Sequence, residues 1–142
     1  MAPLIGRRVA LDLGSVRIGV AATDATGVIA APRSVVSREQ LATQLQELSP
    51  IDRIYVGLPR HLSGQEGLAA KLARDFAIDL KREFNIPIYL LDERLTTKSA
   101  IEIRRSRPDL ADFGIDAIAA FELLEFALAG ERLQGGQFGE TV

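Results

Sequence analysis

Residues 8–13 read RVALDL, and this short run decides the class of fold. Its larger apolar side chains alternate with alanine and aspartate, a spacing typical of a β-strand. A Gly-Ser pair ends the run, and residues 16–23 (VRIGVAAT) and 28–36 continue with two further strand-like segments. Three successive strands joined by short turns predict an antiparallel meander, in which Asp12 lies at the carboxyl end of the first strand.

From residue 37 onward the spacing of apolar residues changes. Helices are predicted over residues 37–48, 64–84, 96–105 and 115–129, and apolar strands over residues 51–58 and 88–91. The order βββαβαβαα predicts an α/β fold with a five-stranded mixed sheet, in which strands four and five are parallel and lie beside strand one. The meander followed by β-α-β-α units predicts helices on both faces of that sheet, and the crossover connections should be right-handed.

The length of 142 residues fits one domain, which we place at residues 1–130, and the glycine-bearing residues 131–142 are predicted to form a flexible C-terminal tail. The absence of cysteine excludes a disulfide scaffold, a thiolate metal site and a cysteine nucleophile, and it agrees with a cytoplasmic location. No apolar run approaches the ~20 residues that a membrane span needs, so we expect no membrane association. A net charge of −2 counts against a strongly basic nucleic-acid binder but leaves room for a local basic patch.

Three acidic residues end or begin the elements that should meet at one edge of the sheet. Asp12 ends the first strand, Glu93 follows the fifth strand in the run LDER, and Asp116 opens the last helix. Open α/β sheets place their ligands outside the carboxyl ends of the strands. Carboxylates that are brought together repel one another unless a cation neutralises them, and their hard oxygens suit Mg²⁺ or Mn²⁺. Two such ions can support hydrolysis of a phosphodiester.

Each carboxylate also has a simpler interpretation. An aspartate at a strand end is commonly a turn former, and Asp116 is favoured electrostatically at a helix N-terminus. Glu93 can be solvated or paired with Arg94. Spacing alone leaves both interpretations open, since a motif is only a hypothesis until its structural context is known.

Four motifs together carry a resemblance to a known family. They are ALDLGSVRIGVA (residues 10–21), VGLP (56–59), LDERLTT (91–97) and IDAIAA (115–120). In this order they resemble the YqgF family, which are bacterial Holliday-junction-resolvase-like proteins of the ribonuclease H-like fold. That family is also linked to trimming the 5′ end of precursor small-subunit ribosomal RNA. The resemblance extends over residues 8–129.

The resemblance implies a site and a function. Asp12, Glu93 and Asp116 match the acidic trio of the family, and are expected to be catalytic and to bind one or two Mg²⁺ or Mn²⁺ ions. The implied function is metal-dependent endonuclease cleavage of structured nucleic acid, first of all 5′-end processing of precursor 16S ribosomal RNA. Resolution of Holliday junctions in DNA recombination and repair is the alternative. A resolvase cuts two symmetric strands and should be a homodimer, whereas an RNA trimmer can be a monomer.

Basic residues near these segments are candidates for contacts to a phosphate backbone. They are Arg17, Arg60, Arg94, Lys98, Arg104 and Arg105. Two alternatives remain open, since Arg94 could instead hold Glu93 in place, and arginines at a helix end commonly form a solvated face. Many family members have a lysine-rich loop before the last helix, where this chain has Asp109 and Asp112.

Two other classes of function remain open. The turn after the first strand resembles the phosphate-binding turn of actin-like ATPases, but those proteins need two such domains and 142 residues supply one. The third class is a non-catalytic factor that binds RNA or the ribosome and retains the fold.

Overall fold

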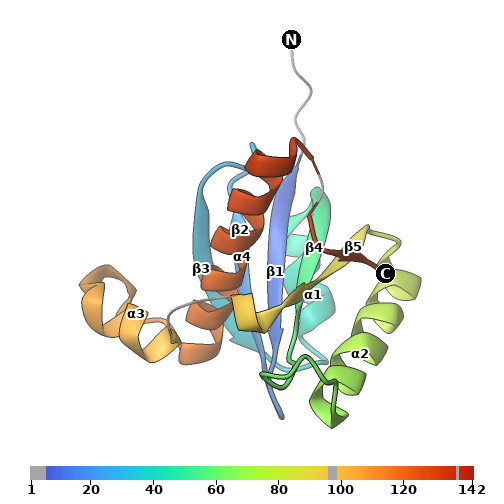
Figure 1. Ribbon diagram of the computed structural model, residues 1–142. Coiled ribbons are helices and arrows are strands. Elements are labelled where there is room, and N and C mark those ends of the chain that lie inside the picture. Colours follow the sequence, from blue (N-terminus) through green and yellow to red (C-terminus); the bar gives the residue numbers. More distant parts are fainter. Residues whose placement is uncertain (1–5, 96–98, 137) are drawn as a thin grey trace.

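The computed structural model describes residues 6–95, 99–136 and 138–142. Its strands are β1 (Arg7–Leu13), β2 (Ile18–Thr23), β3 (Ala30–Val36), β4 (Ile51–Leu58), β5 (Ile88–Asp92) and β6 (Glu140–Thr141). Its α-helices are α1 (Leu41–Leu48), α2 (Leu68–Phe84), α3 (Ala100–Ser106) and α4 (Ile115–Gln134), with single 3₁₀ turns η1 (Glu93–Leu95) and η2 (Pro108–Leu110). Figure 1 shows α4 across one face of the sheet, with α3 standing out to one side.

The strands form one mixed sheet in the order β3-β2-β1-β4-β5-β6. The antiparallel meander β1-β2-β3 and the parallel strands β4 and β5 beside β1 confirm the predicted topology. The predicted count of five strands is wrong, because β6 adds an antiparallel strand at the free edge of β5.

Helices cover both faces of the sheet, as predicted. Alternate residues of β1 point to opposite sides, so Val9 and Leu11 pack with α1 and α2, whereas Ala10 packs with α4. The residues of α4 that face the sheet are small or apolar, and they let the helix lie directly against β1 and β2. Within the residues described, no helix is long and apolar enough to cross a membrane.

Three helices begin later than predicted. Helix α1 begins at Leu41 rather than at residue 37, since residues 37–40 form a hydrogen-bonded turn. Residues 64–67 belong to a loop closed by backbone hydrogen bonds, so α2 begins at Leu68 rather than at residue 64. Leu68 and Leu72 are 73% and 53% exposed, and the buried stripe of α2 consists of alanines, Phe76 and Leu80. The start of the helix predicted at residue 96 lies outside the described residues, and α3 begins at Ala100 with Ser99 as its N-cap.

The expectation of a flexible tail over residues 131–142 is wrong for the part that the structure describes. Helix α4 continues to Gln134 and ends at Gly135, whose φ of 72° is the left-handed conformation typical of a helix C-cap. The ring of Phe138 packs over Gly130, where a Cβ atom would lie 2.5 Å from it. The glycines therefore serve a helix end and a close contact, and the chain then pairs with β5.

Candidate active site

Asp12 is the penultimate residue of β1, and a glycine lies beside it in each neighbouring strand. Gly19 of β2 is its direct partner in the antiparallel pair. On the other side, Gly57 of β4 follows Val56, the parallel partner of Leu11. Because neither glycine has a side chain, other parts of the chain can approach Asp12 closely over both neighbouring strands.

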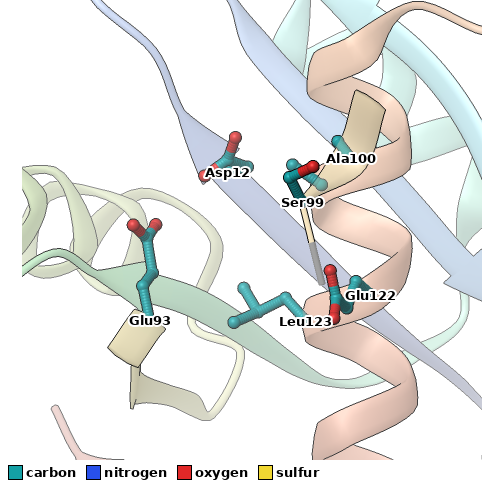
Figure 2. Close-up of a pocket in the computed structure, with 7 residues that line it drawn as sticks. Asp12, Glu93, Ser99, Ala100, Glu122 and Leu123 are labelled. Atoms are coloured by element: carbon teal, nitrogen blue, oxygen red, sulfur yellow. The ribbon is translucent and has the colours of Figure 1, made fainter. Parts of the chain in front are cut away.

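Glu93 approaches Asp12 from η1, directly after β5. Its carboxyl group is hydrogen-bonded to that of Asp12, and Figure 2 shows Glu93 extending towards it. Burial, together with the nearby charge of Asp12, raises the pKa of Glu93 to about 8. Burial also raises the pKa of Asp12, while the hydrogen bond from Glu93 acts in the opposite direction. The two half-buried carboxyl groups therefore share a proton, with Glu93 donating and Asp12 accepting.

Asp116 lies in the first turn of α4, close to the same sheet position. A Cβ atom on Gly19 would lie 1.9 Å from the backbone oxygen of Asp116, so the missing side chain of Gly19 lets α4 contact β2 here. The charge of Asp116 contributes to the raised pKa of Asp12. The structure thus brings all three predicted acidic residues into one region, but only Asp12 and Glu93 are joined directly.

A cavity of about 250 Å³ opens beside the Asp12–Glu93 pair. Its lining comes from β1, η1, the start of α3 and the inward face of α4: Asp12, Glu93, Ser99, Ala100, Ala119, Glu122 and Leu123. Asp116 is not among these residues, whereas Glu122 is. Glu122 was not predicted from the sequence. The sequence does contain a signal for it, because Glu122 is an acidic residue within a mostly apolar helix, one turn after Ala119, which also lines the cavity.

The pair suits a hard divalent cation. Within residues 6–95, 99–136 and 138–142, no group of three or more acidic, histidine or cysteine side chains lies close enough to hold one ion. Mg²⁺, however, commonly binds through one or two carboxylates and completes its shell with water and substrate phosphates. Two half-buried carboxyl groups that repel each other unless protonated offer the donor atoms for such an ion.

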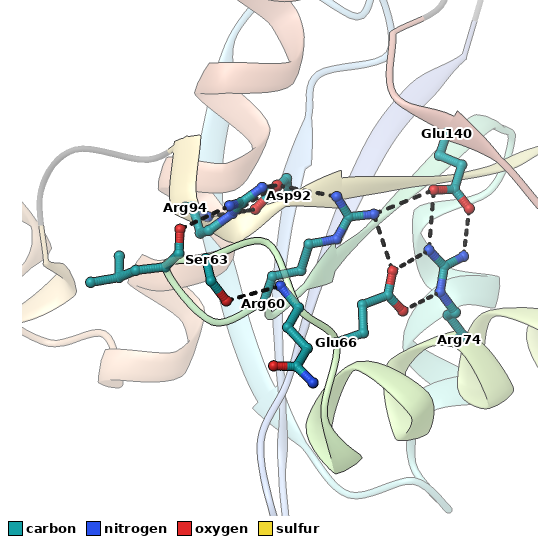
Figure 3. Close-up of polar contacts among 9 residues, drawn as sticks. Arg60, Ser63, Glu66, Arg74, Asp92, Arg94 and Glu140 are labelled. Atoms are coloured by element: carbon teal, nitrogen blue, oxygen red, sulfur yellow. Dashed lines mark hydrogen bonds and ion pairs between the residues drawn. The ribbon is translucent and has the colours of Figure 1, made fainter.

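Two of the arginines predicted to bind nucleic acid are held in internal ion pairs. Arg94 donates to both carboxylate oxygens of Asp92, with Nε 3.0 Å from each. Arg60 lies 3.2 Å from Glu66, 3.5 Å from Asp92 and 3.8 Å from Glu140. Figure 3 shows this network tying the loop after β4 to α2, to the end of β5 and to β6. Arg60 and Arg94 are therefore already neutralised.

The other basic candidates differ in their surroundings. Arg17 is exposed in the β1–β2 turn, and Arg105 is exposed on α3; neither guanidinium has an ion pair with another described residue. Arg104 is half-buried and donates to the backbone oxygen of Phe113 at 3.4 Å. Lys98 lies outside the described residues. The structure thus leaves Arg17 and Arg105 as the predicted arginines that face solvent freely.

A mixed sheet that starts with an antiparallel meander and carries helices on both faces has the architecture of the ribonuclease H-like fold. The chain belongs to the family described as RuvX, Holliday junction resolvase, whose model matches residues 6–130. This confirms the family resemblance carried by the four motifs, and with it the nuclease class and a nucleic-acid substrate.

Curated relatives are similar over almost the whole chain. A protein of Streptomyces avermitilis is 39% identical over 96% of this chain and 94% of its own length, and one of Nocardioides sp. is 38% identical over 96% of both. Each is named "Putative pre-16S rRNA nuclease". Among solved structures, YeaZ from Pseudomonas aeruginosa is similar over 75% of this chain and 50% of its own, with 16% identity and a TM-score of 0.39.

Proposed function

We propose that this protein is a Mg²⁺- or Mn²⁺-dependent endonuclease that cleaves structured nucleic acid, and that its substrate is the 5′ end of precursor 16S ribosomal RNA. The observation that carries the proposal is the Asp12–Glu93 pair, two half-buried and hydrogen-bonded carboxyl groups that line one cavity at the carboxyl end of β1. The RNA substrate is supported by the names of the relatives, which match the chain over nearly its full length. We place this activity in the cytoplasm.

Asp12 and Glu93 would hold the ion, and Asp116 would add negative charge to the same region. When bound there, such an ion would supply activation of a water molecule and neutralisation of the charge that develops on the phosphate. The two carboxyl groups are half-buried, and partial burial strengthens their attraction for a cation. The carboxyl groups must lose their shared proton on binding, so the chain's own contribution includes releasing that proton to solvent.

The test uses purified protein with Mn²⁺, a precursor 16S RNA fragment and a four-way DNA junction. We expect cleavage of the RNA by the wild type and loss of at least about a hundredfold in rate for Asp12→Asn and Glu93→Gln, since each removes a charged donor from the site. Asp79→Asn is the matched control, because Asp79 is exposed on α2 away from the pair. A wild type that cleaves neither substrate, or site variants that cleave normally, would refute the proposal.

Junction resolution is the second candidate, and the family description favours it. A resolvase must make two symmetric cuts, so it requires a homodimer. Sedimentation of the protein with and without a four-way junction separates the candidates: a two-fold complex with paired cuts supports a resolvase, and a monomer that cuts only RNA supports the trimmer. Growth and normal rRNA 5′ ends in cells that carry Asp12→Asn alone would instead indicate a non-catalytic factor.

A further inference from the structure

We propose that Gly57 is a positioning residue. Because Gly57 has no side chain, the carboxyl group of Glu93 can occupy the space beside Asp12 that a Cβ atom at position 57 would fill. The proposal rests on the proposed function for its consequence in metal binding, but its geometry stands on the structure alone. Gly57 lies in β4, between β1 with Asp12 and the end of β5 that leads into Glu93.

The space above Gly57 is occupied by Glu93 itself. A Cβ atom built on Gly57 would lie 2.3 Å from Oε1 of Glu93 and 3.1 Å from both its Cδ and its Cγ. Real Cβ atoms do not approach other atoms to 2.3 Å, so an alanine at this position forces the carboxyl group to move. Gly57 is not among the glycines with positive φ, so its backbone does not require glycine. Its role is therefore one of space and not of conformation.

The backbone that carries Glu93 is fixed, so displacement falls on the side chain. The residues on either side of Glu93 are joined, since Arg94 donates from its backbone nitrogen to Asp92 at 2.9 Å. Arg94 also donates to the backbone oxygen of Leu62 at 3.3 Å, and Arg60 holds Asp92 from the same loop. With η1 held in this way, a displaced Glu93 carboxyl group cannot return to Asp12 by a shift of the main chain.

Gly57 and Gly19 differ in what an added methyl group would meet. At Gly19 the obstructing atom is a backbone oxygen of α4, so a substitution there pushes a whole helix. At Gly57 it is the far end of a flexible side chain, which can rotate away at little cost to folding. Gly57→Ala is thus a selective probe of the site.

The experiment compares wild type, Gly57→Ala and the matched control Gly136→Ala, whose added Cβ meets no atom within 4 Å. We expect Gly57→Ala to weaken Mn²⁺ binding by about tenfold or more, the usual effect of losing a group that orients a ligand. Its melting temperature without metal should stay within about 4 °C of the wild type. Electron paramagnetic resonance of free Mn²⁺ measures the first, and differential scanning fluorimetry the second. Gly136→Ala should change neither.

A second measurement needs no metal and no activity. In the Glu93→Ala background the added methyl group of Gly57→Ala no longer meets a carboxyl group, so it should raise the melting temperature, because strands favour residues with side chains. In the wild-type background it should not. Equal effects in the two backgrounds, or unchanged Mn²⁺ affinity in Gly57→Ala, would overturn the positioning role. If the wild type binds no Mn²⁺ and cleaves nothing, the proposed function fails, and the comparison of melting temperatures alone decides the role of Gly57.

Discussion

The raised pKa of Glu93, which shares a proton with Asp12, predicts how the stability of the folded protein depends on pH. The pKa of Glu93 rises from an ordinary 4.5 to about 8 in the folded protein, so between these values the folded state binds more protons than the unfolded state. The resulting stability is fully present below pH 4.5 and is lost as the pH rises through about 8. The melting temperature of metal-free protein should therefore fall across this window, and Glu93→Gln should remove most of the fall.

Differential scanning fluorimetry in EDTA across that range measures the effect. Glu47→Gln, an exposed position on α1, is the control and should keep the slope of the wild type. Mn²⁺ should reverse the trend, because the ion competes with the shared proton and binds about tenfold more weakly per unit of pH below the higher pKa. Identical slopes for Glu93→Gln and wild type would contradict the shared proton.

The close contact between Gly19 and α4 predicts that a larger residue at position 19 lowers the free energy of unfolding. Gly19→Ala places a methyl group 1.9 Å from the backbone oxygen of Asp116, so α4 must move away from β2. Overpacking of this kind costs about 1–3 kcal/mol, and we expect a loss of unfolding free energy at the upper end of that range. Urea unfolding measures it, with Gly136→Ala as the neutral comparison. A variant as stable as the wild type would show that the contact yields easily.

Sequence alone placed Asp12, Glu93 and Asp116 at the correct ends of their elements, because strand ends follow from the alternation of apolar residues. It could not identify Gly19 and Gly57 as their neighbours. That step needs the register between strands, which depends on contacts across the sheet and not on local spacing. Glu122 was missed for a similar reason, since only the packing of α4 decides which of its faces borders the cavity.

Among the elements, the turn after β1 and helix α3 carry the free arginines, whereas the loop after β4 is neutralised internally. We predict that Arg17→Ala and Arg105→Ala each weaken binding of RNA and lower the slope of affinity against salt by about one unit, as expected for single phosphate contacts. Arg60→Ala and Arg94→Ala should instead act on folding, since each removes one of the two arginine partners of Asp92. Fluorescence anisotropy at several salt concentrations, together with melting curves, separates the two effects.

The opposite pattern is informative as well. A large loss of RNA affinity in Arg60→Ala with unchanged melting would mean that phosphate displaces the acidic partners of this arginine. Sequence could not foresee the network, because it pairs Arg60 with Glu140, a residue in the segment predicted to be a tail. At this scale strands were predicted well from their alternation, whereas the start of α2 and the strand β6 depend on tertiary contacts that local patterns do not contain.

For the whole molecule, α4 is held at both ends in different ways. Its first turn rests on Gly19 beside the site, and its last turn is held at the far end of the sheet by Glu131. Glu131 accepts from Arg8 at 3.1 Å and from the hydroxyl group of Tyr55, and lies 3.6 Å from Arg53. Arg8 and Glu131 are 123 positions apart, so no local pattern in the sequence could reveal this pairing.

Glu131→Gln tests whether the far end governs the site. Removing the charge of Glu131 leaves the nearly buried Arg8 with only Asp52, at 4.0 Å, whereas Arg53 keeps Asp52 at 2.6 Å. The uncompensated charge of Arg8 should cost about 3 kcal/mol in the free energy of unfolding. Since the first turn of α4 keeps its own contact with β2, Mn²⁺ affinity at a temperature where the variant is folded should remain that of the wild type. Glu125→Gln, exposed on the same helix, should change neither quantity. If Glu131→Gln instead weakens Mn²⁺ binding by a free energy similar to its loss in unfolding free energy, the expectation is wrong. That result would mean that α4 moves as a rigid body and that the site depends on contacts along the whole helix.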